Sequence, residues 1–188
     1  MHQLSTASSD CVDLAGPRLQ AALPEREWSG MAQERHRYRG WVWPGSQLSA
    51  VGAARLVALE ALADWRLGPM ADDVALCVSE LVTNALTHAL VCLDRRVPRQ
   101  VVLGLRYFPS SCLFVEVGDW DPRPPLLPVV AVDADPLESL ALGGRGLLLV
   151  CEMADFVWWT RREPGGKYVY ARLDTPRYFG AGEEVGND

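Results

Sequence analysis

The chain has 188 residues, a length typical of one domain with some residues to spare. Apolar residues make up 49% and charged residues 22%, which is the balance of a globular protein with a packed core. The net charge of −6, from 18 basic and 24 acidic residues, argues against direct binding to nucleic acid, because such binding uses a clustered basic surface. A nucleotide ligand stays possible, since helix N-termini and backbone N–H groups can hold phosphate.

The five cysteines and three histidines are scattered, and no two cysteines form a Cys-x-x-Cys pair, so the sequence predicts no zinc site. An odd number of cysteines without an apolar N-terminal signal segment favours reduced thiols in the cytoplasm. No run of residues approaches the ~18 consecutive apolar positions of a membrane-spanning helix. We therefore expect a cytoplasmic protein that does not enter a membrane.

Composition divides the chain into three parts. Residues 1–35 mix Ser, Pro, Gln and charges without a sustained period, and are expected to form a flexible extension that could hold a short helical patch. Residues 36–174 carry periodic apolar patterns and should form the folded domain. Residues 175–188 are expected to be a polar tail.

The folded part begins with an alternating aromatic stretch at 38–43, which predicts a strand. Ser46 or Ser49 is a candidate cap for a helix that follows and that ends at the Gly-Pro pair 68–69. Residues at helical spacing in this helix, with the leucines Leu56, Leu59 and Leu62 among them, are expected to form a face that packs on a sheet.

A second helix should start near Met70, with two aspartates in its first turn, where they complement the helix dipole. Its expected apolar face consists of Val74, Cys77, Val78, Leu81, Val82 and Ala85. Strands are predicted at 100–107 and 112–118, then a proline-rich loop at 119–142, a short helix at 146–153, and strands at 156–161 and 167–173. This order predicts an α+β fold, a two-layer sandwich with a mostly antiparallel sheet covered on one face by three helices.

The second helix carries the most informative polar residues. Glu80, Asn84 and His88 are spaced i, i+4, i+8 and therefore line one stripe beside the apolar face. They could supply a general base, an oxygen ligand for Mg²⁺ and a polar contact to substrate. A solvated helix face would show the same pattern, but asparagine is a poor helix former, so Asn84 calls for a positional reason.

Two further segments could contribute to a site. The predicted strand at 112–118 delivers Asp119 to the start of the long loop, where a carboxylate can accept a purine amine or simply terminate the strand. The sequence Gly143-Gly-Arg-Gly-Leu-Leu-Leu-Val150 opens a helix whose N–H groups can hold phosphate, or is a flexible loop entering a buried helix. It is not a P-loop, because the Lys-Ser/Thr ending is absent.

Together these segments resemble the GHKL ATPases, and among them the anti-sigma-factor serine/threonine kinases of bacteria, especially the short ATP-binding regulators of actinobacteria. The resemblance covers roughly residues 38–173. Ser79-Glu-Leu-Val-Thr-Asn-Ala-Leu-Thr-His-Ala89 is similar to the N-box, Val117-Gly-Asp-Trp-Asp-Pro-Arg-Pro-Pro125 to the first glycine box, and Gly144-Arg-Gly-Leu-Leu-Leu-Val150 to the second. The fold that this implies is the Bergerat fold of the GHKL ATPases.

The resemblance also implies roles for individual residues. Asn84 would coordinate the Mg²⁺ that bridges the phosphates, Glu80 would activate the attacking hydroxyl, and Asp119 would bind the adenine amine. Arg55 matches a family arginine that helps to position the transferred phosphoryl group. The residues expected to bind the nucleotide are Asn84, His88, Asp119, Gly144, Arg145, Gly146, Leu147 and Lys167, with His88 a structural or lid contact rather than a catalyst.

Two positions depart from the family pattern. Trp120-Asp121-Pro122 replaces the glycines expected after Asp119, which should stiffen that loop and could reshape the adenine pocket. Where many relatives place a threonine in the last glycine-containing motif, this chain has Gly165-Gly-Lys-Tyr168, and Lys167 itself is common in the actinobacterial subgroup. Neither departure removes Glu80 or Asn84.

The resemblance predicts a kinase that uses ATP and Mg²⁺ to phosphorylate a serine or threonine of an anti-anti-sigma partner, that sequesters a sigma factor, and that forms a homodimer. An ATP-binding module that controls its partner by stoichiometric contact, with little or no catalysis, is the alternative. A fragment of a sensor histidine kinase is a third interpretation, but no phosphoacceptor-helix domain precedes the ATP-binding segment.

Overall fold

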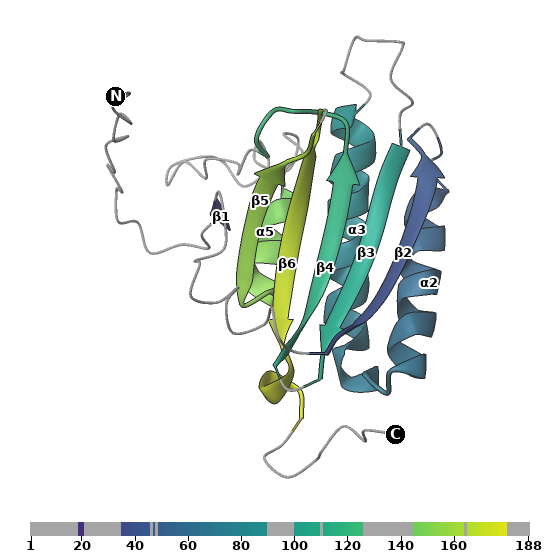
Figure 1. The fold of residues 1–188 in the computed structure, drawn as a ribbon, viewed down its shortest axis with the longest axis vertical. Coiled ribbons are helices and arrows are strands. Elements are labelled where there is room, and N and C mark those ends of the chain that lie inside the picture. The colour runs from purple at the N-terminus through teal and green to yellow at the C-terminus, as the bar shows by residue number, and fades with distance from the viewer. Residues whose placement is uncertain are drawn as a thin grey trace, which may run out of the picture.

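The computed structural model of the chain describes residues 19–20, 35–45, 47, 49–89, 100–109, 111–125, 145–163 and 165–179. Within these ranges, one six-stranded sheet has the order β1-β5-β6-β4-β3-β2 (Figure 1). The strands are β1 (Leu19–Gln20), β2 (Arg37–Pro44), β3 (Gln100–Phe108), β4 (Cys112–Asp119), β5 (Phe156–Arg161) and β6 (Lys167–Asp174). The helices are α2 (Ala50–Asp64), α3 (Ala71–Ala89) and α5 (Arg145–Met153), with 3₁₀ turns η1 (Gly68–Met70) and η2 (Thr175–Arg177).

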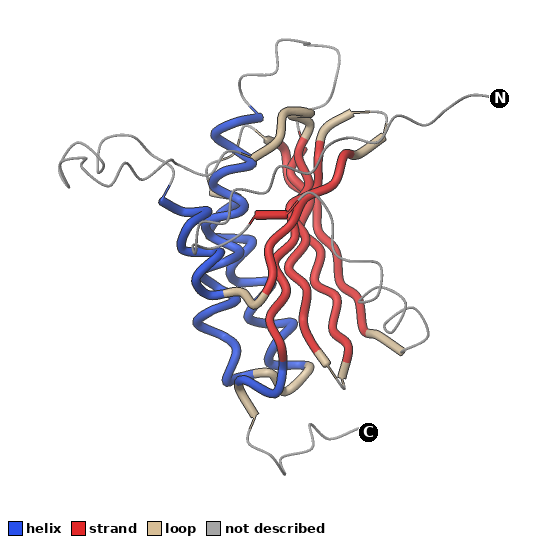
Figure 2. The backbone as a smooth tube through the Cα atoms, turned by 90° about the vertical axis from the view of Figure 1, so that its left-hand side faces the viewer, coloured by secondary structure: helices blue, strands red, loops and turns tan. Residues whose placement is uncertain are grey.

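All three α-helices lie on one face of the sheet, which makes two layers (Figure 2). Every strand pair is antiparallel except β1 with β5, which is parallel. The predicted α+β sandwich, with a mostly antiparallel sheet covered on one face by three helices, is therefore confirmed. In the described part of the chain, no helix combines the length and the apolar character needed to cross a membrane.

The main core lies between the helices and the sheet. The six apolar residues predicted for α3, from Val74 to Ala85, are all buried at 3% exposure or less, so the periodicity of this helix gave its buried face correctly. Successive side chains of a strand point to opposite faces of the sheet. Those of β4 and β6 that point to the helices include Val115, Val117, Val169 and Ala171. The opposite face carries a smaller aromatic cluster around Phe108, Phe114 and Trp158.

Helix α2 buries a different face from the one predicted. Leu56 and Leu59 are 63% and 37% exposed, whereas Ala54, Ala58 and Leu62 are buried. The expectation that the leucines pack inward was wrong for these two, because alanines allow α2 to approach α3 closely and thereby take the inner positions. Ser49 occupies the N-cap position, but its side chain makes no capping hydrogen bond.

The ordered structure also reaches past both expected boundaries of the domain. Within the N-terminal extension, Leu19–Gln20 form β1; the short helical patch considered there falls outside the described residues. Beyond residue 174, Thr175 is buried and the Tyr178 hydroxyl donates a 2.6 Å hydrogen bond to Asp73 Oδ2 at the start of α3. Residues up to 179 therefore belong to the folded unit rather than to a polar tail.

Candidate functional site

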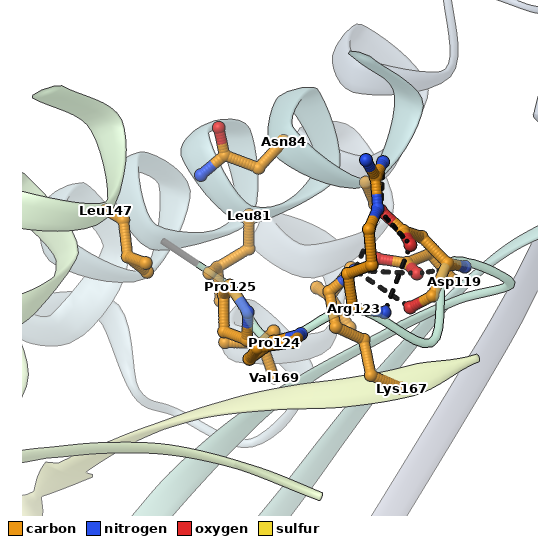
Figure 3. Close-up of a pocket in the computed structure, with 12 residues that line it drawn as sticks. Leu81, Asn84, Asp119, Arg123, Pro124, Pro125, Leu147, Lys167 and Val169 are labelled. Carbon is orange, nitrogen blue, oxygen red and sulfur yellow. Dashed lines mark hydrogen bonds and ion pairs between the residues drawn. The ribbon is translucent and has the colours of Figure 1, made fainter. Parts of the chain in front are cut away.

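A cavity of about 340 Å³ opens between the helical layer and the ends of β4 and β6 (Figure 3). Its volume falls in the usual range of small-molecule sites, about 300–1,000 Å³. Apolar side chains form most of its wall, and a few polar groups lie on one side. The lining residues are Leu81, Asn84, Ala85, Val117, Asp119, Asp121, Arg123, Pro124, Pro125, Leu147, Lys167 and Val169.

The polar side of the cavity is built on a buried ion pair. Asp119 ends β4 and Lys167 begins β6, and the antiparallel register places them directly opposite each other. Lys167 Nζ lies 2.9 Å from Asp119 Oδ2 and 3.0 Å from Oδ1, and the two side chains are only 6% and 4% exposed. Lys167 Nζ also donates to the backbone carbonyl of Asp121 at 3.1 Å. The ammonium and the carboxylate thus hold each other in place at the edge of the sheet.

Gly166 allows this approach. Its φ of +94° lies in the left-handed region, and a Cβ atom added there would overlap the backbone carbonyl of Asp119 and come within 2.9 Å of Trp120 Cα. The neighbouring Gly165 has open space around it. Glycine is therefore needed at the second position of this turn, where it lets Lys167 lie against Asp119.

Two successive side-chain turns fix the chain after β4. Asp119 Oδ1 accepts a 2.8 Å hydrogen bond from the backbone N–H of Asp121, and Asp121 Oδ1 accepts one of 3.1 Å from that of Arg123. The Arg123 guanidinium then binds the Asp121 carboxylate, with Nη2 2.8 Å from Oδ2. Of the three residues that replace the family glycines, Asp121 is therefore held in these turns and lines the cavity.

The two carboxyl groups have opposite pKa shifts. Burial raises the pKa of Asp119 above its ordinary value, although Lys167 and the N–H of Asp121 act in the other direction. Burial also acts to raise the pKa of Asp121, but the hydrogen bonds from Arg123 and the charge of Lys167 outweigh it, so that pKa is lowered. Asp121 is therefore ionised over a wider pH range than Asp119.

The helical side of the cavity is formed by α3 and α5. Asn84 and Leu81 lie on α3 above the prolines Pro124 and Pro125 (Figure 3). Glu80, one helical turn before Asn84, is half-buried and does not line the cavity. Its carboxylate lies against Gly146 in the first turn of α5, where a side chain larger than glycine would overlap it. The sequence motif had not indicated this contact between Glu80 and the second glycine box.

The structure brings together four of the residues predicted to bind the nucleotide: Asn84, Asp119, Leu147 and Lys167 line one cavity. Arg55 does not join them, because it is exposed on α2 and is absent from the lining. His88 and Arg145 lie in described helices, but their side chains are outside the described part, as is the whole of Gly144.

Sequence reasoning did not single out the apolar walls or Arg123. Alternation along strands could have found two wall residues, since Val117 is two positions before Asp119 and Val169 two after Lys167. The repeated Asp-x-Asp-x-Arg spacing from Asp119 could have indicated the consecutive turns. Leu81 and Ala85 were predicted only as core residues, and they flank Asn84 on the same helix.

The cavity fits a nucleotide better than it fits a metal ion held by protein alone. Its apolar walls suit the faces of a base, and Asp119 with Lys167 offers an acceptor and a donor for the edge of a base. Within the described residues, no group of three or more His, Cys, Asp or Glu side chains could hold a metal. Asn84 could give Mg²⁺ one oxygen ligand, because Mg²⁺ commonly completes its shell with phosphate oxygens and water.

Comparison with known proteins identifies the fold family. The model of the histidine kinase-like ATPase domain matches residues 45–173, which include every residue that lines the cavity. A chain of the crystal structure of the SiaB-SiaC complex from Pseudomonas aeruginosa is similar in fold, with a TM-score of 0.54 and 15% sequence identity over 79% of this chain and 96% of that one. No curated protein matches the chain. The chain therefore belongs to the histidine kinase-like ATPase domain family, and the ligand that this assignment implies is ATP.

Proposed function

We propose that the protein is an ATP-binding anti-sigma regulator that acts as a Mg-ATP-dependent serine/threonine protein kinase. The observation that carries the proposal is the cavity that Asn84 lines together with the Asp119–Lys167 pair, within a histidine kinase-like ATPase domain. The apolar walls would hold adenine, Asp119 would accept its amine, and Asn84 would hold Mg²⁺. When bound, Mg²⁺ supplies charge neutralisation for the phosphates.

Phosphoryl transfer needs positioning and charge more than it needs covalent chemistry from the protein. Glu80 lies one turn before Asn84 on α3, and its carboxylate lies against Gly146 at the start of α5 without lining the cavity. It would take the proton of the attacking hydroxyl. The segment 144–147 would close over the phosphates as a lid, and His88 would contact that lid. Arg55 would have to be brought to the transferred phosphoryl group when the partner binds.

The proposed protein substrate is an anti-anti-sigma factor, and the proposed second ligand is a sigma factor. The sequence resemblance supports both, and the similar SiaB-SiaC structure is itself a complex between two proteins. We further propose that the protein acts as a homodimer in the cytoplasm and contacts neither membrane nor nucleic acid directly, in keeping with its net charge of −6.

Calorimetry with ATP and Mg²⁺ tests the nucleotide site. We expect one site per chain, with binding lost in Asp119→Ala and weakened in Asn84→Ala. Asp64→Ala is a suitable control, because Asp64 pairs with Arg39 on the surface and neither residue lines the cavity. If the wild-type protein bound no nucleotide, or if all three variants bound equally well, the proposal would be wrong.

Labelled ATP tests the kinase activity. Wild-type protein mixed with a candidate anti-anti-sigma partner should transfer label to that partner, and Glu80→Gln should reduce the rate by about 100-fold or more, the usual contribution of a general base. Glu60→Gln removes an exposed carboxylate from α2 and should not change the rate. Equal labelling by wild type and Glu80→Gln would exclude Glu80 as the base.

One observation favours the binding module as a second candidate. Glu80 does not line the cavity, and Arg55 points to solvent, so the two residues assigned to transfer are not assembled around the ligand. In a module that acts by stoichiometric contact, ATP would bind and the partner would be held, but label would not transfer. The same labelling experiment separates the two candidates, provided that calorimetry shows ATP bound.

A further inference from the structure

The face of the sheet that turns away from the helices has a buried part and an exposed part. Phe114 on β4 and Trp158 on β5 are 0% and 1% exposed, and their rings meet edge to face at 5.5 Å. Tyr38 and Val42, on β2 of the same face, are 51% and 55% exposed. All three α-helices cover the other face (Figure 2). The aromatic cluster is therefore buried on a side of the sheet to which the helices contribute nothing.

Neighbouring side chains of the sheet do not explain this burial. They stand beside one another, so they cover the flanks of a ring and leave its outer edge accessible. The long side chains next to Phe114 are directed elsewhere, since Arg172 binds Asp174 at 2.6 Å and Arg106 binds Glu116 at 2.8 Å. An exposure of 0% requires atoms above the ring. Because a single chain by itself has this exposure, the covering atoms belong to the same chain.

Residues 21–34, which lie outside the described ranges, form a connecting segment with both ends at the aromatic cluster. Before the segment, β1 pairs with β5 and places Gln20 opposite Trp158. After it, the His36 ring lies 5.1 Å from the ring of Phe108, another member of the cluster. Strands β1 and β2 are the opposite edges of the sheet, so the segment passes from one edge to the other. The main core fills the helical face, which leaves the face with the cluster as the route.

The connecting segment has the length and the side chains for this crossing. Five steps between neighbouring strands separate β1 from β2, which is about 24 Å at the usual strand spacing. The 14 residues from 21 to 34 reach up to about 46 Å when extended. The segment therefore has slack to lay side chains on the sheet. Its large apolar side chains are those of Leu23, Trp28 and Met31.

The other stretches outside the described ranges have their ends elsewhere. Residues 126–144 start at the wall of the cavity and end at α5, in the helical layer. Residues 90–99 join α3 to the start of β3, and residues 180–188 follow Phe179, which packs on the main core. Residues 1–18 are tied to the sheet at one end only. The segment between β1 and β2 is thus the one that meets the aromatic cluster at both ends.

We propose that residues 21–34 cross the aromatic cluster of their own chain and cover it, with Trp28 packed on Phe114 and Trp158. Trp28 is the aromatic residue of the segment and lies near its middle. An indole packed on other aromatic rings buries a large apolar area. A second copy of the chain as the cover would have left these rings exposed in the single chain. The inference does not depend on nucleotide binding, and it gives the N-terminal part of the chain a place in the fold.

Nuclear Overhauser effects in the full-length protein test this placement directly. The indole resonances of Trp28 are identified by their loss in Trp28→Phe. We expect effects between the Trp28 ring and the rings of Phe114 and Trp158. A mixture of isotope-labelled and unlabelled chains separates contacts within a chain from contacts between chains. Absence of effects between Trp28 and these two rings, or effects between chains only, would overturn the inference.

The native thiols provide a second measurement. Cys112 belongs to the aromatic cluster and Cys77 to the main core, and both are free and 0% exposed. The rate of alkylation by iodoacetamide at each thiol, resolved by peptide mass, reports how often its surroundings open. Trp28→Ser should raise the rate at Cys112 at least about tenfold and leave the rate at Cys77 unchanged, because loss of a buried ring makes local opening easier.

Two control variants accompany this measurement. Trp28→Phe keeps an aromatic ring and should stay near the wild-type rate, and Gln33→Ser changes a polar residue of the same segment and should match wild type. Equal rates at Cys112 in wild type and Trp28→Ser would overturn the inference. A parallel rise at Cys77 would show that Trp28 supports the main core and not this face of the sheet, and would overturn it as well.

Discussion

The sheet end and the helix end of the cavity differ in how their polar groups are held. At the sheet end, Asp119, Lys167 and Asp121 bind one another through contacts of 2.8–3.1 Å and are almost fully buried. At the helix end, no hydrogen bond or ion pair joins the side chain of Asn84 to another residue in the described ranges, and Glu80 lies outside the lining, against Gly146. The sheet end is therefore organised by contacts within the protein, and among the described residues no such contacts hold the side chain of Asn84. Mutations at the first end should affect folding and binding together, and those at the second should affect function alone.

The largest effect is expected for Asp119→Ala. This change leaves the Lys167 ammonium buried without its counter-ion, which costs about 3–5 kcal/mol of unfolding free energy when a buried pair is broken. Asp64→Ala breaks the Arg39–Asp64 pair, whose members are 39% and 59% exposed, and should cost less than about 1 kcal/mol. Urea unfolding of the two variants measures the contrast. Equal losses would show that the buried pair does not organise the sheet end.

Gly166→Ala should have the next largest effect. The added methyl group would overlap the Asp119 carbonyl, and alanine at a φ of +94° is strained, so we expect a loss of at least about 1–2 kcal/mol. Gly165→Ala meets open space and should change stability by less than about 0.5 kcal/mol. Thermal unfolding compares the two. A tolerated Gly166→Ala would mean that Lys167 does not need this tight turn to reach Asp119.

Asn84→Ala tests the helix end. Because its side chain has no partner in the described structure, the change should alter the unfolding free energy by less than about 0.5 kcal/mol. It should nevertheless weaken ATP binding in the presence of Mg²⁺, by about tenfold for one lost ligand, and leave Mg-free binding unchanged. Thr83→Ala, an exposed neighbour on α3, should change neither quantity. A weaker Mg-free complex would show that Asn84 contacts the nucleotide and not the metal.

The smallest effect is a pH dependence of nucleotide binding. Asp119 must be ionised to accept the adenine amine, and burial raises its pKa. The charged groups that face Asp119 are Lys167 and Asp121, and the Arg123 guanidinium is bound to the Asp121 carboxylate. As the pH falls, affinity should therefore start to fall at a higher pH than an ordinary aspartate would cause. Asp119→Asn cannot take up this proton. The ratio of the ADP affinities of wild type and Asp119→Asn should decrease toward acidic pH, and a constant ratio would contradict the assignment.

The elements of this fold were largely predictable, because each depends on local periodicity. The buried face of α3 and the bounds of β5 were predicted correctly, since α3 is apolar at the helical period and β5 is a short apolar run that ends at charged residues. The buried face of α2 was not predicted correctly. Its alanines and its leucines lie on different sides of the helix, and only the contact with α3 decides which side is buried. The short β1 carries no sequence pattern and depends on pairing with β5.

By itself, the sequence predicted the two-layer α+β fold and singled out Glu80, Asn84 and Asp119 as candidate site residues. Only the tertiary structure decided that Lys167 meets Asp119 across 48 residues, that Gly166 makes room for the meeting, and that Glu80 packs against Gly146 instead of lining the cavity. The physical reason is that periodicity encodes which way a side chain points within its own element. Strand register and helix approach, which decide what that side chain touches, arise from the packing of the whole domain.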